Sequence, residues 1–171
     1  RLPWRGLLAR YMSALARDDY SYTRPSVRRG EPALFPSLRS EQIDIAIALD
    51  TSGSVAKSEL SAFLTEVDAI KSQMRARITL YACDTRLAAD APWLFEPWEP
   101  CVLPTCLSGG GGTRFAPVFD ALARCDRAPE LLVYFTDACG EFPSHAPYYP
   151  VLWLVKGKAL VPWGERIQLN D

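Results

Sequence analysis

The chain has 171 residues, of which 49% are hydrophobic, and its formal net charge is -1. This length is enough for one domain with a substantial core, and the apolar content excludes a disordered chain. No apolar run approaches the roughly 20 residues of a membrane-spanning helix, so we expect no membrane contact.

The N-terminal part is basic and amphipathic. Residues 4–16 carry apolar side chains at helical spacing, which predicts a helix, and residues 18–40 are rich in Arg, Ser and Pro, which predicts an extended linker. We therefore divide the chain into an N-terminal helix and basic arm (1–40) and a folded domain (41–171). The start is neither a Met nor a signal peptide, so we expect a piece of a larger protein.

Charge is distributed unevenly between these parts. Residues 1–40 contain eight Arg and three acidic residues, whereas residues 41–171 contain eleven basic and seventeen acidic residues. A basic arm can bind nucleic acid. We favour packing of the arm on the acidic body instead, and we expect no nucleic-acid partner. The apolar anchors for such packing are Trp4, Tyr11, Leu34 and Phe35.

Residues 41–171 alternate strand and helix patterns. Apolar runs predict strands at 43–49, 78–83, 131–135 and 151–155, with short edge strands near 93–98 and at 166–169. Apolar stripes predict helices over 57–74 and 114–125, the second beginning close to Pro117. This order predicts an α/β fold: a Rossmann-like, mostly parallel central sheet with helices on both faces.

Oxygen-bearing side chains follow two of the predicted buried strands. Asp50, Ser52 and Ser54 come directly after strand 43–49, and Asp137 follows strand 131–135. Thr113 follows four glycines, a run that lets its loop approach other groups closely. The carboxyl ends of parallel strands share one sheet edge, where ligands bind. Carboxylate and hydroxyl oxygens suit Mg²⁺ or Mn²⁺, so the five residues predict a site for one such ion.

Simpler interpretations of the same residues exist. Asp50, Ser52 and Ser54 are good caps for the helix that follows, and Asp84 serves either a turn or indirect support of the site. The glycine run is not a P-loop, because no Lys precedes Thr113.

The cysteines add no competing site. They are five in number and irregularly spaced, which is not the pattern of a disulfide framework, and His145 is the only histidine available to a zinc site. We expect reduced thiols and a cytoplasmic location.

The Asp-x-Ser-x-Ser pattern followed by a distant Thr and Asp resembles the metal-ion-dependent adhesion site of von Willebrand factor A (VWA) domains. Further motifs resemble one bacterial subgroup, the VWA-like domain found C-terminal to a putative metallopeptidase region. These motifs are Tyr81-Ala82-Cys83-Asp84, Phe135-Thr136-Asp137, Val151-Leu152-Trp153 and Pro162-Trp163-Gly164. The resemblance covers roughly residues 20–169 and implies a trimmed VWA fold.

The resemblance also implies a function. Ser52, Ser54 and Thr113 would bind the ion directly or through water, Asp50 and Asp137 often through water, and an acidic side chain of a protein partner would complete the shell. Bacterial relatives often work beside AAA+ ATPases, which makes such an ATPase the expected partner. This chain departs from the family pattern at Ala138, where Gly is usual, and at Arg114, where an acidic or small polar residue is common.

We therefore expect a divalent-metal-dependent protein-binding module without enzymatic activity. The second hypothesis is metal-assisted hydrolysis at the same ion, although the pattern offers no spare His or Glu as a base. The third is a structural domain that regulates an upstream putative metallopeptidase.

Overall fold

The computed structural model describes residues 3–20, 42–105, 107 and 109–169, and its centre is a six-stranded sheet of order β3-β2-β1-β4-β5-β6. The strands are β1 (Ile43–Asp50), β2 (Ala76–Cys83), β3 (Trp93–Phe95), β4 (Leu131–Thr136), β5 (Val151–Val155) and β6 (Glu165–Gln168). All pair in parallel except β3, which runs antiparallel to β2 at one edge. The predicted α/β fold with a mostly parallel sheet is confirmed.

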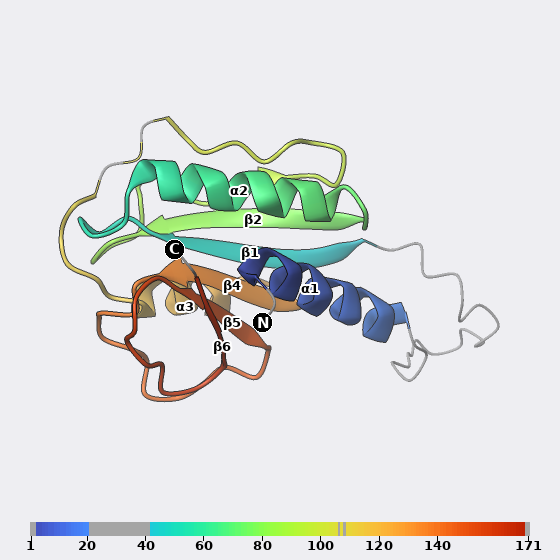
Figure 1. Cartoon of the computed structure of the whole chain (residues 1–171). Helices are drawn as coiled ribbons and strands as arrows, with labels where there is room; N and C mark the ends of the chain where they lie inside the picture. The colour runs from blue at the N-terminus through green and yellow to red at the C-terminus, as the bar shows by residue number, and fades with distance from the viewer. Residues whose placement is uncertain (1–2, 21–41, 106, 108, 170–171) are drawn as a thin grey trace.

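Three helices cover the sheet: α1 (Trp4–Tyr20), α2 (Lys57–Lys71) and α3 (Ala116–Ala123). Helices α1 and α2 lie on one face and α3 on the other, so helices cover both faces of the sheet, as predicted (Figure 1). Pro117 falls in the first turn of α3, where its missing N–H is not needed. Residues 18–20, predicted as linker, continue α1 instead; the rest of the predicted basic arm lies outside the described residues. Among the described residues, no helix combines the length and apolarity required to cross a membrane.

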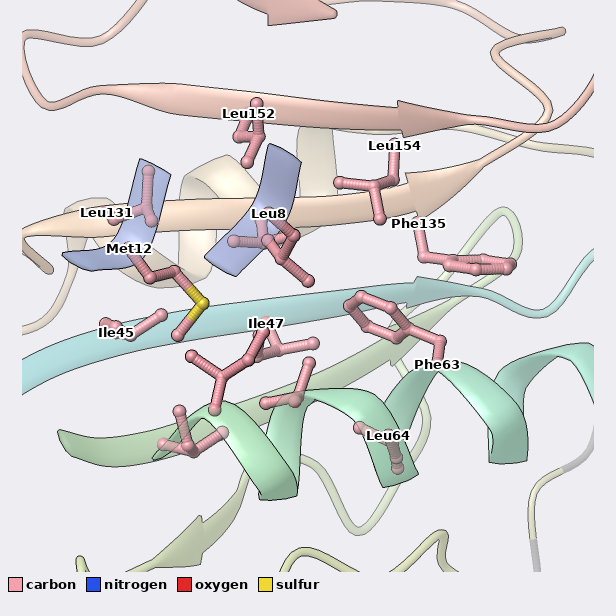
Figure 2. Close-up of a cluster of buried hydrophobic side chains, with 14 of the residues drawn as sticks. Leu8, Met12, Ile45, Ile47, Phe63, Leu64, Leu131, Phe135, Leu152 and Leu154 are labelled. Atoms are coloured by element: carbon pink, nitrogen blue, oxygen red, sulfur yellow. The ribbon is translucent and has the colours of Figure 1, made fainter. Parts of the chain in front are cut away.

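The larger core lies between the sheet and helices α1 and α2. Leu8 and Met12 of α1, Ile45 and Ile47 of β1, and Phe63 of α2 meet there, each almost inaccessible to solvent (Figure 2). The N-terminal helix therefore packs on the body and shares its main core. This agrees with the expectation that its apolar residues anchor it there.

The second core, under α3, is aromatic. The rings of Phe115, Tyr134 and Trp153 have centroids 5.1–5.2 Å apart and are fully buried. Phe115 directly follows the Thr113 loop and precedes α3, so this cluster fixes the point at which that loop rejoins the body.

Strand β1 lies in the middle of the sheet, between β2 and β4. Its chain connection leads through α2 to β2 on one side, whereas β4 on the other side arrives later in the sequence. The carboxyl ends of β1 and β4 therefore lie side by side at a topological switch point, the position where open α/β sheets bind ligands.

Candidate functional site

Asp50 ends β1 as a fully buried carboxylate, with 0% of its surface exposed. Its Oδ1 accepts a hydrogen bond from the Ser52 N–H at 2.8 Å, and its Oδ2 accepts one from the Thr136 hydroxyl at 2.5 Å. Thr136 Oγ1 in turn accepts the N–H of Ala138 at 2.9 Å. Because a buried charge is stable only when hydrogen-bonded, these donors account for the position of Asp50.

The two serines connect this carboxylate to the loop after β4. The hydroxyls of Ser52 and Ser54 are 3.3 Å apart, and the Ser54 hydroxyl donates to Asp137 Oδ2. Asp137 Oδ1 accepts the Cys139 N–H at 3.0 Å, which fixes the second carboxylate. Asp50, Ser52, Ser54 and Asp137 thus form one continuous hydrogen-bonded group at the carboxyl ends of β1 and β4.

Helix α2 does not use these serines as its cap. Its N-cap residue is Ala56, and the N–H of Ala56 is bound by Glu59 Oε1 at 2.9 Å. The Ser52 and Ser54 hydroxyls are directed to each other and to Asp137 instead. The capping interpretation therefore does not describe how the motif is used here.

The glycine-rich loop crosses directly over the Asp50–Ser54 turn. The Gly110 N–H donates to the Thr51 carbonyl oxygen at 2.8 Å, and a Cβ atom placed on Gly109 lies only 2.2 Å from that oxygen. Only glycine permits this approach, so the crossing requires a glycine at position 109.

Thr113 packs against Gly140, which lies three residues after Asp137 in the loop that follows β4. A Cβ atom on Gly140 would lie 2.7 Å from Thr113 Cγ2. Within the described ranges, the Thr113 hydroxyl makes no hydrogen bond to the other four predicted ligands. The structure therefore places Thr113 against the loop that follows Asp137, without a hydrogen bond to the group.

Two charged residues near the site, Asp84 and Arg114, interact with groups outside the predicted ligand set. Asp84 Oδ1 accepts the Arg86 N–H at 3.1 Å, so Asp84 closes a turn; its Oδ2 faces the glycine-rich loop, 3.2 Å from a Cβ placed on Gly111. Arg114 is half-exposed, with its Nε 3.9 Å from Glu141 Oε1.

Ala138, where the family pattern has Gly, adopts a φ of 62°. This is the left-handed region, which glycine occupies most readily. A glycine at this position would therefore adopt the same backbone with less strain than Ala138.

Lys156 lies at the candidate site and was not among the residues predicted from the sequence. It directly follows β5, and its Nζ donates to the Ser54 carbonyl oxygen at 2.8 Å and to Glu59 Oε1 at 3.0 Å. Partial burial acts to raise the pKa of Glu59, but the hydrogen bonds from Ala56 N–H and Lys156 outweigh it and lower that pKa. The position of Lys156 directly after a parallel strand was the available signal, because all such strands end at one sheet edge.

The Cys83 thiol, which lies next to Asp50 in the sheet, is neutral at neutral pH. Cys83 pairs with Asp50 across β1 and β2, and burial, followed by the charges of Asp84 and Asp50, raises its pKa to about 12. Tyr134 lies fully buried beneath it, and burial also raises the pKa of that phenol. Both groups stay protonated at neutral pH, so they add no charge to that of the carboxylates.

The donor chemistry of the corner fits a hard divalent cation. No group of three or more His, Cys, Asp or Glu side chains is placed to hold a metal among the described residues. The predicted set contains only two such side chains, Asp50 and Asp137, and its other donors are hydroxyls. This mixture excludes a zinc-type site of nitrogen and sulfur ligands and suits Mg²⁺ or Mn²⁺.

Comparison with known proteins assigns the fold to a family. The model of the VWA-like domain (DUF2201) family matches residues 45–170. An uncharacterised protein of Thermotoga maritima is 29% identical over 143 residues, which cover 83% of this chain and 34% of that protein's length. The solved structure of an aerotolerance-related membrane protein from Bacteroides fragilis, carrying multiple mutations to serines, is 16% identical, with a TM-score of 0.46 over 66% of this chain and 67% of that one. Because the family match covers most of the chain, this protein belongs to the VWA-like domain (DUF2201) family.

Proposed function

We propose that this domain binds one Mg²⁺- or Mn²⁺-type ion and uses it to bind a protein partner through an acidic side chain. The observation that carries the proposal is the hydrogen-bonded group of Asp50, Ser52, Ser54 and Asp137 at the switch point, with Thr113 beside it. These are the five residues of the metal-ion-dependent adhesion pattern, drawn from three separate segments of the chain.

The arrangement supports a division of roles among the ligands. The Ser52, Ser54 and Thr113 hydroxyls would hold the ion, and Asp137 would balance its charge from the half-buried rim. Both carboxylate oxygens of Asp50 already accept hydrogen bonds, which favours an indirect role for this residue. When bound, the ion supplies an electrophilic centre for a partner's carboxylate.

Among the described residues, the two cations at the corner are paired with glutamates outside the group. Lys156 is shared with Glu59, and Arg114 is directed to Glu141. The negative charge of Asp50 and Asp137 is therefore left for a metal ion rather than for a protein cation.

We further propose that the domain is a binding module rather than an enzyme. The only histidine, His145, is exposed, and its Nδ1 lies 3.1 Å from the Ser144 hydroxyl. Within the described residues it makes no hydrogen bond to Asp50, Ser52, Ser54 or Asp137, which favours binding over general-base catalysis at this site. We propose that the domain belongs to a larger bacterial, cytoplasmic protein, as in the subgroup with an upstream putative metallopeptidase region, and that its partner is an AAA+ ATPase. The matched region covers 34% of the Thermotoga relative, which is consistent with a module of a longer chain.

The test is titration calorimetry of the chelator-treated protein with Mg²⁺ and Mn²⁺. We expect one ion to bind, and binding to be lost in Asp137→Asn, whose side chain is half-buried and whose substitution preserves shape. Asp126→Asn, an exposed carboxylate beyond the far end of α3, is the matched control and should bind as the unaltered chain does.

A second titration adds a short acidic peptide, because a partner's carboxylate completes the shell. Tighter metal binding with this peptide than with its glutamine counterpart supports the proposal. Absence of metal binding both with and without the peptide would rule the metal-dependent function out.

A further inference from the structure

A buried ammonium holds the turn after β3 rigidly against helix α2. Lys71, the last residue of α2, is 2% exposed, and its Nζ donates to the carbonyl oxygens of Glu96 at 2.6 Å, Pro97 at 3.2 Å and Glu99 at 2.5 Å. Burial of a lysine is unfavourable unless all its donors are satisfied, so this turn is a built feature of the fold.

Further bonds fix the same turn from both sides. Glu99 Oε1 accepts the Glu96 N–H at 2.8 Å, and Asp68 Oδ1 of α2 accepts the Cys101 N–H at 2.9 Å. Residues 96–101 are therefore attached to the C-terminal turn of α2 by backbone and side-chain bonds. Loss of entropy on binding a partner would be small for a segment held in this way.

This rigid turn presents a large aromatic side chain to solvent. Trp98 is 74% exposed, and Leu94 and Val102, before and after the turn, are 50% and 57% exposed. Tryptophan is one of the three residue types enriched among those that dominate protein interfaces. Leu94 and Val102 add exposed apolar area within the same segment.

The charge of the segment identifies the kind of partner. Residues 88–105 contain Asp90, Glu96 and Glu99 and no Lys, Arg or His. Glu96 lies 3.7 Å from Arg77, whereas Glu99, next to Trp98, is exposed and forms no ion pair within the described residues. An indole face beside a carboxylate binds a guanidinium by stacking and by charge together.

We propose that the Trp98 turn is a second protein-binding surface, which takes an arginine-bearing segment of a partner. It lies at the C-terminal end of α2, whereas the candidate metal site lies before its N-terminal end (Figure 1). The 15 residues of α2 separate the two by about 22 Å. The proposal therefore goes beyond the metal-dependent function, and binding here needs no metal.

The test is an NMR titration of the isotope-labelled full chain with a blocked peptide of alternating Leu and Arg. We expect saturable shifts confined to residues 93–102, unchanged by EDTA, and at least tenfold weaker binding in Trp98→Ala, about the size of a desolvated cation–π contact. Glu99→Gln, which keeps an oxygen acceptor for the Glu96 N–H, should also weaken binding. Tyr148→Ala, which removes an aromatic side chain that is 90% exposed, is the matched control and should leave binding unchanged.

A citrulline version of the peptide keeps the shape of arginine without its charge. Weaker binding of the citrulline peptide supports the proposal. Equal binding of both peptides, equal loss in Tyr148→Ala and Trp98→Ala, or no shifts at 93–102 would overturn it. Metal titration of Trp98→Ala separates this result from the proposed function, because that variant should bind the ion normally.

Discussion

The Thr136 hydroxyl donates to Asp50 Oδ2 across 2.5 Å and thereby joins the last residues of two neighbouring strands. The same oxygen accepts the N–H of Ala138, where the backbone turns into the loop that carries Asp137. One hydroxyl thus places both carboxylates of the candidate site. It does so without belonging to the ligand pattern itself.

Thr136→Val keeps the shape of this side chain but removes both hydrogen bonds. We expect a loss of about 2–3 kcal/mol in the free energy of unfolding, because a buried carboxylate oxygen loses its donor. Urea unfolding measures the loss. Thr136→Ser should retain most of the stability, and Thr65→Val, which removes an exposed hydroxyl on α2, should change it by less than about 0.5 kcal/mol. Equal stability of Thr136→Val and the unaltered chain would contradict the assigned role.

Gly109→Ala should displace the glycine-rich loop from the Asp50–Ser54 turn. The added Cβ lies 2.2 Å from the Thr51 carbonyl oxygen, so the backbone must move, at a cost of about 1–3 kcal/mol. Gly112→Ala is the matched control, since its Cβ meets only Thr85 Cγ2 at 3.6 Å. Thermal unfolding of both variants tests this, and identical melting temperatures would show that the loop is not held there.

Lys71→Met should destabilise the fold by about 2–4 kcal/mol, because three backbone carbonyl oxygens lose their donor in a buried setting. Lys57→Met removes an exposed ammonium from the other end of α2 and should have little effect. Chemical denaturation gives both values. In Lys71→Met, amide exchange at residues 96–101 should also become faster, and unchanged exchange would mean that other contacts suffice to hold the turn.

Alkaline pH should weaken the fold through Cys83. The ordinary thiol pKa of 9.0 applies to the unfolded chain, whereas burial and the charges of Asp84 and Asp50 raise the folded value to about 12. Between these values the folded state binds more protons, so the free energy of unfolding falls as pH rises through this window. Urea unfolding at intervals from about pH 8 to 11 measures the slope.

Cys83→Ala provides the control for that slope. It should unfold more readily at neutral pH, because a buried side chain is truncated, but lose less stability on going to alkaline pH. Tyr149, whose pKa burial and its neighbours raise to about 12, leaves part of the slope in place. A slope that is identical in both proteins would exclude Cys83 as the titrating group.

The strands and helices could be predicted because the faces that each element buries determine the spacing of its apolar residues in the sequence. Strand β1 is apolar on both faces since helices cover both, and α2 shows one apolar stripe since only one of its sides faces the sheet. The meeting of Asp50 and Asp137 followed from the rule that parallel strands end at one edge. It needed only the adjacency of β1 and β4, which the structure confirms.

Other features depend on three-dimensional contacts that carry no local pattern. Lysine is normally a surface residue, so the sequence gives no sign that Lys71 is buried. Its burial is explained by three carbonyl oxygens in a segment 25–28 residues later. The position of Thr113 beside the group, rather than within it, depends on how two glycine-containing loops pack. Lys156 and Thr136 were within reach of the strand-end argument but lie outside the ligand pattern.

The distance along the chain between Asp50 and Thr136, 86 residues, has a consequence for the order of assembly. Strands β1 and β2 with α2 between them are contiguous in sequence, so we expect them to close before β4 joins, while Asp50 still lacks the Thr136 donor. Pairing of β4 with β1 requires closure of a long loop. Only after this pairing does Thr136 donate to the Asp50 carboxylate and offset the cost of burying it. A nascent chain halted before residue 131 therefore carries Asp50, Ser52 and Ser54 but neither Asp137 nor the Thr136 hydroxyl that stabilises the Asp50 carboxylate.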